Sequence, residues 1–249
     1  MRNTDLVYNT LIAQAKVNSG LKQLEIFDYI VDLGFNSIEV RREYFKDVDR
    51  EIESISQFSL EKNITILYSI PEVIFLENGE VNPEIKRYFG EAINLKATHV
   101  KMTIGNYQNK AQLQNLNLIN DQPFIFTIEN DQTKQSGTVQ NILKFLTEAK
   151  YEQINIGYTY DLGNFRYVGE DEITGAEKLR DYVSYIHLKN VTQSADTLLA
   201  TSLEQGDIDW RKAILYLPKD VPIALEYPSD DKEEILTDKQ SIEVLGYGN

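Results

Sequence analysis

The sequence predicts an α/β fold, a (β/α)8 barrel that forms a single domain over residues 1–249. Two observations favour this fold. Eight short β-rich runs alternate with helix-like segments, and no low-complexity or Pro/Gly-rich linker divides the chain. Such alternation is typical of a parallel sheet with right-handed crossovers, and eight repeats in about 250 residues fit a closed barrel. An open doubly wound sheet is the second candidate, but its phosphate-binding pattern G-x-G-x-x-G is absent.

The predicted strands are short runs rich in β-branched and aromatic residues. They occupy residues 6–10, 37–41, 64–70, 99–104, 124–129, 154–161, 183–189 and 222–227.

The segments between the strands carry helix signals. Residues 21–34 repeat apolar side chains at nearly helical spacing. Asn82 followed by Pro83 is typical of a helix start, an N-cap with proline in the first turn. Asp209 is a capping residue before the next apolar segment. Thr237 has a glutamine three residues later, which is capping-box spacing and predicts a short last helix starting there.

The alternation of side chains along each strand predicts which residues enter the barrel. In the strand at 124–129, Phe124, Phe126 and Ile128 share one face, and Glu129 lies on the other. The other strands divide in the same way, into a bulky apolar face and a face of smaller or ionisable residues. We expect the second face to line the lumen. Its members include Glu39, Arg41, His99, Lys101, Thr127, Glu129, Thr159, Asp161, Tyr185, His187, Lys189, Ala224 and Glu226.

Composition excludes several classes of function. The net charge of −14 argues against nucleic acid or an anionic membrane surface as a partner. The absence of cysteine excludes disulfides, thiolate metal sites and a cysteine nucleophile. No apolar run reaches the roughly 20 residues that span a bilayer, and the N-terminus does not resemble a signal peptide. We therefore expect a cytoplasmic protein.

Four residues at the carboxyl ends of consecutive strands form the candidate site: Glu129, Asp161, His187 and Glu226. Active sites of (β/α)8 barrels lie at this end. One acid at a strand end is usually a solvated loop residue or a helix cap, so the prediction depends on all four matching positions. Three crowded carboxylates repel each other unless a cation joins them. We predict one divalent metal ion, with Mn²⁺ favoured over Mg²⁺, Co²⁺ and Zn²⁺.

Around these residues the chain resembles the sugar phosphate isomerase/epimerase family, the xylose isomerase-like TIM barrels. The resemblance covers nearly the whole chain. Its motifs are GFNSIEVRREYF (34–45), ILYSIPE (66–72), VKMTIG (100–105), TIENDQT (127–133), YDLGNFRYVGEDE (160–172), YIHLKNV (185–191), QGDIDW (205–210) and ALEYP (224–228).

The resemblance implies that Glu129, Asp161, His187 and Glu226 bind the metal. It also implies that Glu129 and Glu226 are catalytic, transferring protons next to the carbonyl of an open-chain sugar or sugar phosphate. Two positions depart from the epimerase pattern. Asn164 stands where a histidine often follows the metal-binding aspartate, and Lys189 is the only cation where an arginine often follows the histidine.

Seven further residues are candidate substrate contacts, six because they fall on the inward face or in the loops at the predicted mouth, and Tyr68 because an aromatic face can stack on the C–H surface of a sugar. They are Lys101, Arg41, Glu39, Tyr68, Asn164, Arg166 and Lys189. A salt bridge within the lumen is the competing interpretation for Lys101, and a surface ion pair is the competing one for Arg166. His99 is predicted to pack low in the barrel.

Three other functions stay open at this point. A dehydratase of a polyol ketone would need a similar metal site, and a barrel with altered substrate contacts would bind a sugar without converting it. A phosphate-ester hydrolase would need more histidine or aspartate ligands than we find. The expected partner is a small-molecule sugar or sugar phosphate. The sequence has no oligomer signature, so a monomer and a homo-oligomer both stay open.

Overall fold

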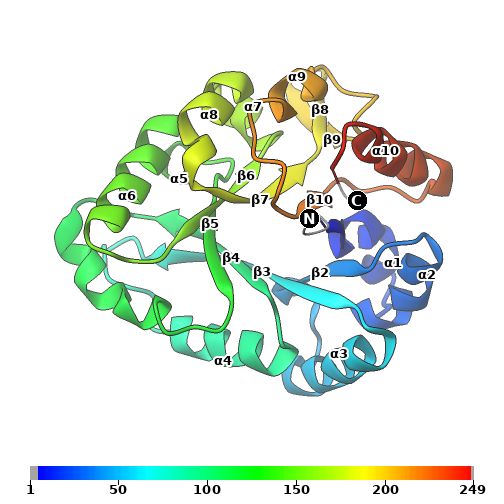
Figure 1. Ribbon diagram of the computed structural model, residues 1–249, viewed down its shortest axis with the longest axis horizontal. Helices are drawn as coiled ribbons and strands as arrows, with labels where there is room; N and C mark the ends of the chain where they lie inside the picture. The colour runs from blue at the N-terminus through cyan, green and yellow to red at the C-terminus, as the bar shows by residue number, and fades with distance from the viewer. Residues whose placement is uncertain (1–4, 248–249) are drawn as a thin grey trace.

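The computed structural model describes residues 5–247, which form a closed barrel of eight parallel strands surrounded by helices (Figure 1). The strand order around the barrel is β1-β10-β7-β6-β5-β4-β3-β2. The strands are β1 (Leu6–Asn9), β2 (Ser37–Arg41), β3 (Thr65–Phe75), β4 (His99–Gly105), β5 (Ile125–Glu129), β6 (Gly157–Asp161), β7 (Val183–Leu188) and β10 (Ile223–Leu225). The predicted fold class is confirmed.

Helices connect successive strands and cover the outside of the barrel (Figure 1). The α-helices are α1 (Gln14–Asn18), α2 (Phe27–Asp32), α3 (Val48–Lys62), α4 (Ile85–Leu95), α5 (Lys134–Gly137), α6 (Val139–Tyr151), α7 (Asn164–Val168), α8 (Glu172–Leu179), α9 (Trp210–Ile214) and α10 (Lys232–Val244). The 3-10 helices are η1 (Thr10–Ala13), η2 (Gln23–Ile26), η3 (Arg42–Tyr44), η4 (Lys110–Ile119) and η5 (Arg180–Tyr182).

Side-chain alternation places the two faces of each strand as the sequence predicts. Phe124 and Phe126 point outward, where both rings pack edge-on against Phe89 of α4 with centroids 5.2 Å apart. The large core lies in this layer between sheet and helices. A smaller, separate cluster lies inside the barrel and consists of Val7, Leu67, Tyr185 and Ala224. This cluster forms an apolar floor, and the polar ends of the strands lie beyond it.

Some predicted boundaries were wrong. Strand β6 begins at Gly157 instead of residue 154, and β3 continues to Phe75, with a shift of register between Ser69 and Val73. Helix α10 begins at Lys232, because the Asp231 side chain accepts hydrogen bonds from two backbone amides of the first turn. Thr237 lies within that helix, where its hydroxyl bonds back to the carbonyl of Glu233.

An antiparallel hairpin of β8 (Asn190–Ser194) and β9 (Thr197–Thr201) follows β7 and was not predicted. It forms a separate two-stranded sheet outside the barrel (Figure 1). Among residues 5–247, no helix is long and apolar enough to cross a membrane.

Candidate metal centre

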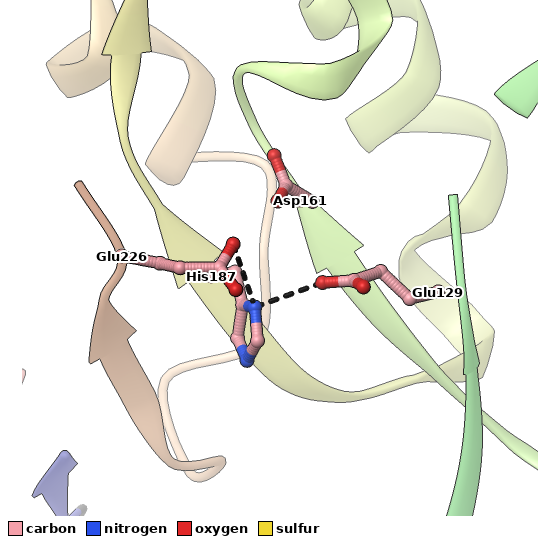
Figure 2. A group of neighbouring side chains, drawn as sticks. All are labelled: Glu129, Asp161, His187 and Glu226. Atoms are coloured by element: carbon pink, nitrogen blue, oxygen red, sulfur yellow. Dashed lines mark ion pairs between the residues drawn. The ribbon is translucent and has the colours of Figure 1, made fainter. Parts of the chain in front are cut away.

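The four predicted residues converge at one end of the barrel. Glu129 and Asp161 are the last residues of β5 and β6, His187 lies near the end of β7, and Glu226 directly follows β10. One ligand atom from each residue lies within 4.8 Å of the others, and all four side chains are buried (Figure 2). Strand pairing places these residues at the same height along the barrel axis, since His187 is in register with both Asp161 and Ala224.

His187 is the centre of the group. Its Nδ1 atom lies 2.8 Å from Oε1 of Glu129 and 3.2 Å from Oε2 of Glu226 (Figure 2). Its Nε2 atom lies 2.8 Å from Oε2 of Glu39, and the same carboxylate oxygen accepts a hydrogen bond from the hydroxyl of Tyr185. The imidazole is therefore fixed from below, with Nδ1 turned towards the acids.

Three cations of the chain neutralise the carboxylates. Lys101 is paired with Oε2 of Glu129. Lys189 Nζ lies 2.5 Å from Oδ2 of Asp161 and 3.0 Å from Oε2 of Glu226. Arg41 Nη1 lies 2.7 Å from Oε1 of Glu226. With Glu39, the four buried carboxylates and three cations leave the cluster close to neutral.

These pairings hold the two glutamates ionised. Burial favours the neutral form of Glu129, but Lys101 and His187 outweigh it and lower the pKa of that carboxyl to about 2. Burial acts in the same direction on Glu226, where Lys189, His187 and Lys101 hold the pKa well below its usual range. Both glutamates are therefore carboxylates at neutral pH and can accept protons.

The pKa values of Asp161 and His187 are raised instead of lowered. Burial, together with Glu226 and Glu129, raises the pKa of Asp161 to about 7 in spite of Lys189. Burial disfavours the charged imidazole, but the surrounding carboxylates raise the pKa of His187 well above its ordinary value. Near neutral pH and without a metal ion, His187 therefore keeps its proton and Asp161 is protonated in part, and an entering cation would have to displace these protons.

The arrangement fits a divalent cation. Nδ1 of His187 and Oε1 of Glu129 are buried and pair with each other at 2.8 Å, and neither has a hydrogen-bond partner outside the cluster among the described residues. A carboxylate on the second ring nitrogen, as Glu39 provides, is the usual support of a metal-binding histidine. Three carboxylates and one imidazole suit hard or borderline ions. These four residues could hold a metal ion.

A pocket of about 460 Å³ opens above the cluster. Its lining contains both polar and apolar side chains. The polar lining includes Arg41, Lys101, Glu129, Asp131, Gln132, Asn164, Lys189 and Glu226, and the apolar lining is Leu11, Ile70, Pro71 and Val73.

The predicted substrate contacts divide into two groups. Arg41, Lys101, Asn164 and Lys189 line the pocket. Three others do not line it, and each has a partner elsewhere. Glu39 lies beneath His187. Tyr68 points outwards, with its hydroxyl on Glu91 of α4, and Arg166 forms a partly exposed ion pair with Glu172.

Asn130 is a positioning residue for which the sequence analysis predicts no role. Its side chain donates to the carbonyl of Asp161 and accepts from the amide of Asp161 and the hydroxyl of Tyr158. Its carbonyl accepts from the side chain of Asn164. Asn130 therefore holds the end of β6 in place. Its position directly after the predicted ligand Glu129 is the feature of the sequence that could have indicated this role.

Asn9 is a second positioning residue that sequence reasoning missed. At the end of β1, its amide donates to Oε1 of Glu226 over 3.1 Å. It is fully buried and also caps η1 by accepting from the amide of Leu11. Asn9 is a polar residue near the end of the first predicted strand, which could have pointed to it, but only the closed barrel brings β1 beside β10.

Comparison with known proteins gives matches among solved structures only. No protein-family model matches the sequence, and no curated protein does. A xylose isomerase domain-containing protein from Salmonella typhimurium LT2 superposes with a TM-score of 0.72 at 14% identity, covering 97% of both chains. The chain has the xylose isomerase-like TIM-barrel fold.

Other proteins of this fold superpose over nearly their whole length. D-allulose 3-epimerase from Methylomonas sp., in complex with D-allulose, gives a TM-score of 0.71 at 13% identity, covering 99% of this chain and 98% of that one. IolI with a bound zinc atom gives 0.71 at 14%, covering 98% of each. The probable 3-DHS dehydratase AsbF from Bacillus anthracis gives 0.72 at 14%, covering 99% and 100%. Identities this low establish the fold alone, so activity must be argued from the site.

Proposed function

We propose that the protein is a metal-dependent isomerase or epimerase of a sugar or sugar phosphate. The observation that carries the proposal is the buried cluster of Glu129, Asp161, His187 and Glu226 beneath an open pocket. The epimerase and the zinc-containing protein of the same fold support it. A bound divalent ion, with Mn²⁺ as our first choice, would act as a Lewis acid and stabilise negative charge on the substrate oxygens.

Glu129 and Glu226 transfer the protons in this proposal. Both are ionised and flank His187, Glu129 at the end of β5 and Glu226 directly after β10. Lys101 and Arg41 pair with the carboxylate oxygens that do not face His187. One carboxylate removes a proton from the carbon next to the carbonyl, which leaves an enediolate. The other takes up a proton from solvent and delivers it to the same carbon in an epimerase or to its neighbour in an isomerase, and the first carboxylate then releases its proton to solvent.

The pocket residues position the substrate. Arg41, Lys101, Lys189 and Asn164 offer donors to hydroxyl, carbonyl or phosphate oxygens. The apolar lining at Ile70 and Val73 suits the C–H surface of a sugar. Asn164 is tied to Asn130 and Gln132, so it also fixes the pocket wall.

The test follows exchange of substrate hydrogen with solvent. Wild-type protein loaded with Mn²⁺ is incubated in D2O with a panel of ketoses and ketose phosphates, and deuterium next to the carbonyl is measured by mass spectrometry. We expect Glu129→Gln and Glu226→Gln to abolish exchange. The control Glu72→Gln, at an exposed position on the rim, should exchange at the wild-type rate. Exchange at that rate in both site variants would show that these glutamates do not transfer the proton.

A dehydratase of a polyol ketone is the second candidate, and the structural match to AsbF favours it. Product analysis in the same assay separates the candidates. An isomerase or epimerase conserves substrate mass, whereas a dehydratase releases water. A sugar-binding barrel without activity would bind the sugar in the presence of Mn²⁺ but would give neither deuterium exchange nor any product.

A further inference from the structure

Lys189 occupies an unusual place in the cluster. Its ammonium group bridges Oδ2 of Asp161 and Oε2 of Glu226, at 2.5 and 3.0 Å. Oε2 of Glu226 is also the oxygen that faces Nδ1 of His187. Lys189 therefore shares an oxygen with the atoms that would have to surround a metal ion.

The other two cations bind differently. Lys101 is paired with Oε2 of Glu129, whereas Oε1 of that residue faces His187. Arg41 is paired with Oε1 of Glu226, whereas Oε2 faces His187. In each of these carboxylates, the inner oxygen is the one that faces Nδ1 of His187, and the outer oxygen is the other one. Lys101 and Arg41 both pair with outer oxygens. Lys189 alone among these three takes an inner oxygen.

Close packing holds Lys189 in this place. Its stem lies against Gly163, where an added Cβ atom would come within 2.7 Å of Cγ and 3.2 Å of Cε of the lysine. The Lys189 side chain is only 9% exposed. Packing as well as charge therefore holds the ammonium group between the two carboxylates, unlike the ammonium group of a flexible surface lysine.

We propose that the ammonium group of Lys189 is the resident cation of the metal-free site, and that a divalent ion must displace it to bind. The proposal rests on the metal site of the proposed function. Three converging carboxylates need counter-charges to fold together, and Lys189 supplies the one that sits on an oxygen facing His187. Metal entry then moves the ammonium group into the adjoining pocket, which Lys189 already lines. There it faces the substrate.

Metal affinity tests the displacement. Isothermal titration with Mn²⁺ compares the wild type with Lys189→Met, which keeps a long apolar stem and removes the competing charge. We expect Lys189→Met to bind Mn²⁺ at least about tenfold more tightly. Lys101→Met is the matched control, because it removes an equally buried charge from an outer oxygen. Its gain in affinity should be clearly smaller.

A second measurement needs no variant. Acylation of lysines by an amine-reactive ester, located by mass spectrometry, should modify Lys189 more after Mn²⁺ is added, while Lys101 stays unchanged. Equal Mn²⁺ affinities of wild type and Lys189→Met, or unchanged acylation of Lys189, would overturn the displacement and leave the metal site standing. Absence of Mn²⁺ binding in the wild type and both variants would overturn the metal site as well.

Discussion

Glu39 determines what His187 can do. Its carboxylate accepts hydrogen bonds from Nε2 of His187 and from the hydroxyl of Tyr185, deep below the pocket. A partner on Nε2 keeps the proton there and leaves Nδ1 to act as a ligand. The sequence placed Glu39 in the lumen but grouped it with substrate contacts. Its supporting position follows from the ring of His187, whose orientation no alternation pattern specifies.

Replacing Glu39 with glutamine tests this support. Glu39→Gln turns a strong acceptor into a group that also donates, so the imidazole loses its fixed tautomer. We expect Mn²⁺ affinity to fall by about 10- to 100-fold, measured by isothermal titration. Tyr185→Phe is the control, since it removes one hydrogen bond to Glu39 but leaves His187 paired, and it should lose much less. Wild-type affinity in Glu39→Gln would contradict the supporting role.

The sequence predicted the convergence of four residues because two simple rules suffice for it. Alternation turned Glu129, Asp161, His187 and Glu226 inward, and the barrel brought the ends of their strands together. Tyr68 was predicted as a substrate contact from its aromatic character and not from these rules, and it does not line the pocket. Tyr68 alternates with Leu67, which lies in the lumen, so the tyrosine faces the helices.

At the scale of elements, Asn130 joins β5, β6 and α7. It satisfies both backbone groups of Asp161 and links them to Tyr158 and Asn164. Buried backbone groups that lose a partner are costly, because water cannot replace it. The junction therefore stabilises the barrel and sets the height of Asp161 at the same time.

Removing this junction should cost stability. Asn130→Ala leaves the amide and carbonyl of Asp161 and the hydroxyl of Tyr158 without this partner, and we expect a loss of about 3 kcal/mol in the free energy of unfolding. Urea denaturation followed by circular dichroism measures it. Gln132→Ala, which removes one partly buried hydrogen bond to Asn164, should lose less than about 1 kcal/mol. Equal losses would show that Asn130 has no special role.

The β8–β9 hairpin and the start of α10 are two features that the sequence did not predict correctly. Strands β8 and β9 pair only with each other, and only Asn190 and Val191 at the start of β8 are buried, so their sequences lack the apolar alternation of a barrel strand. Their turn places Ala195 at a φ of 51°, without the glycine or asparagine that usually marks such a position. For α10, the capping-box spacing at Thr237 predicted a start that is too late, because the side chain of Asp231 caps the helix six residues earlier.

At the scale of the whole molecule, His99 links stability to pH. It lies low in the barrel beside the ring of Tyr185, and burial lowers its pKa to about 4. Between that value and its ordinary value of 6.5, the unfolded chain binds a proton that the folded chain excludes. This group therefore makes the folded state more stable as pH rises through that window, and less stable as pH falls.

A non-titrating residue at this position should remove that dependence. We expect the wild type to lose up to about 3 kcal/mol of unfolding free energy between pH 6.5 and 4 through His99, and His99→Gln to lack this loss. Urea denaturation of the metal-free proteins at intervals of pH gives the difference between the two curves. Parallel curves across the window would contradict the assignment.

The near-neutral cluster has a consequence for encounter rates. Four carboxylates and three cations almost cancel there, so nearly all of the net charge of −14 is spread over the rest of the molecule. The long-range field is thus set by the exterior, and it attracts divalent ions while repelling anionic sugars. Added salt should slow the association of divalent ions and speed the association of anionic sugars, although both ligands reach the same pocket.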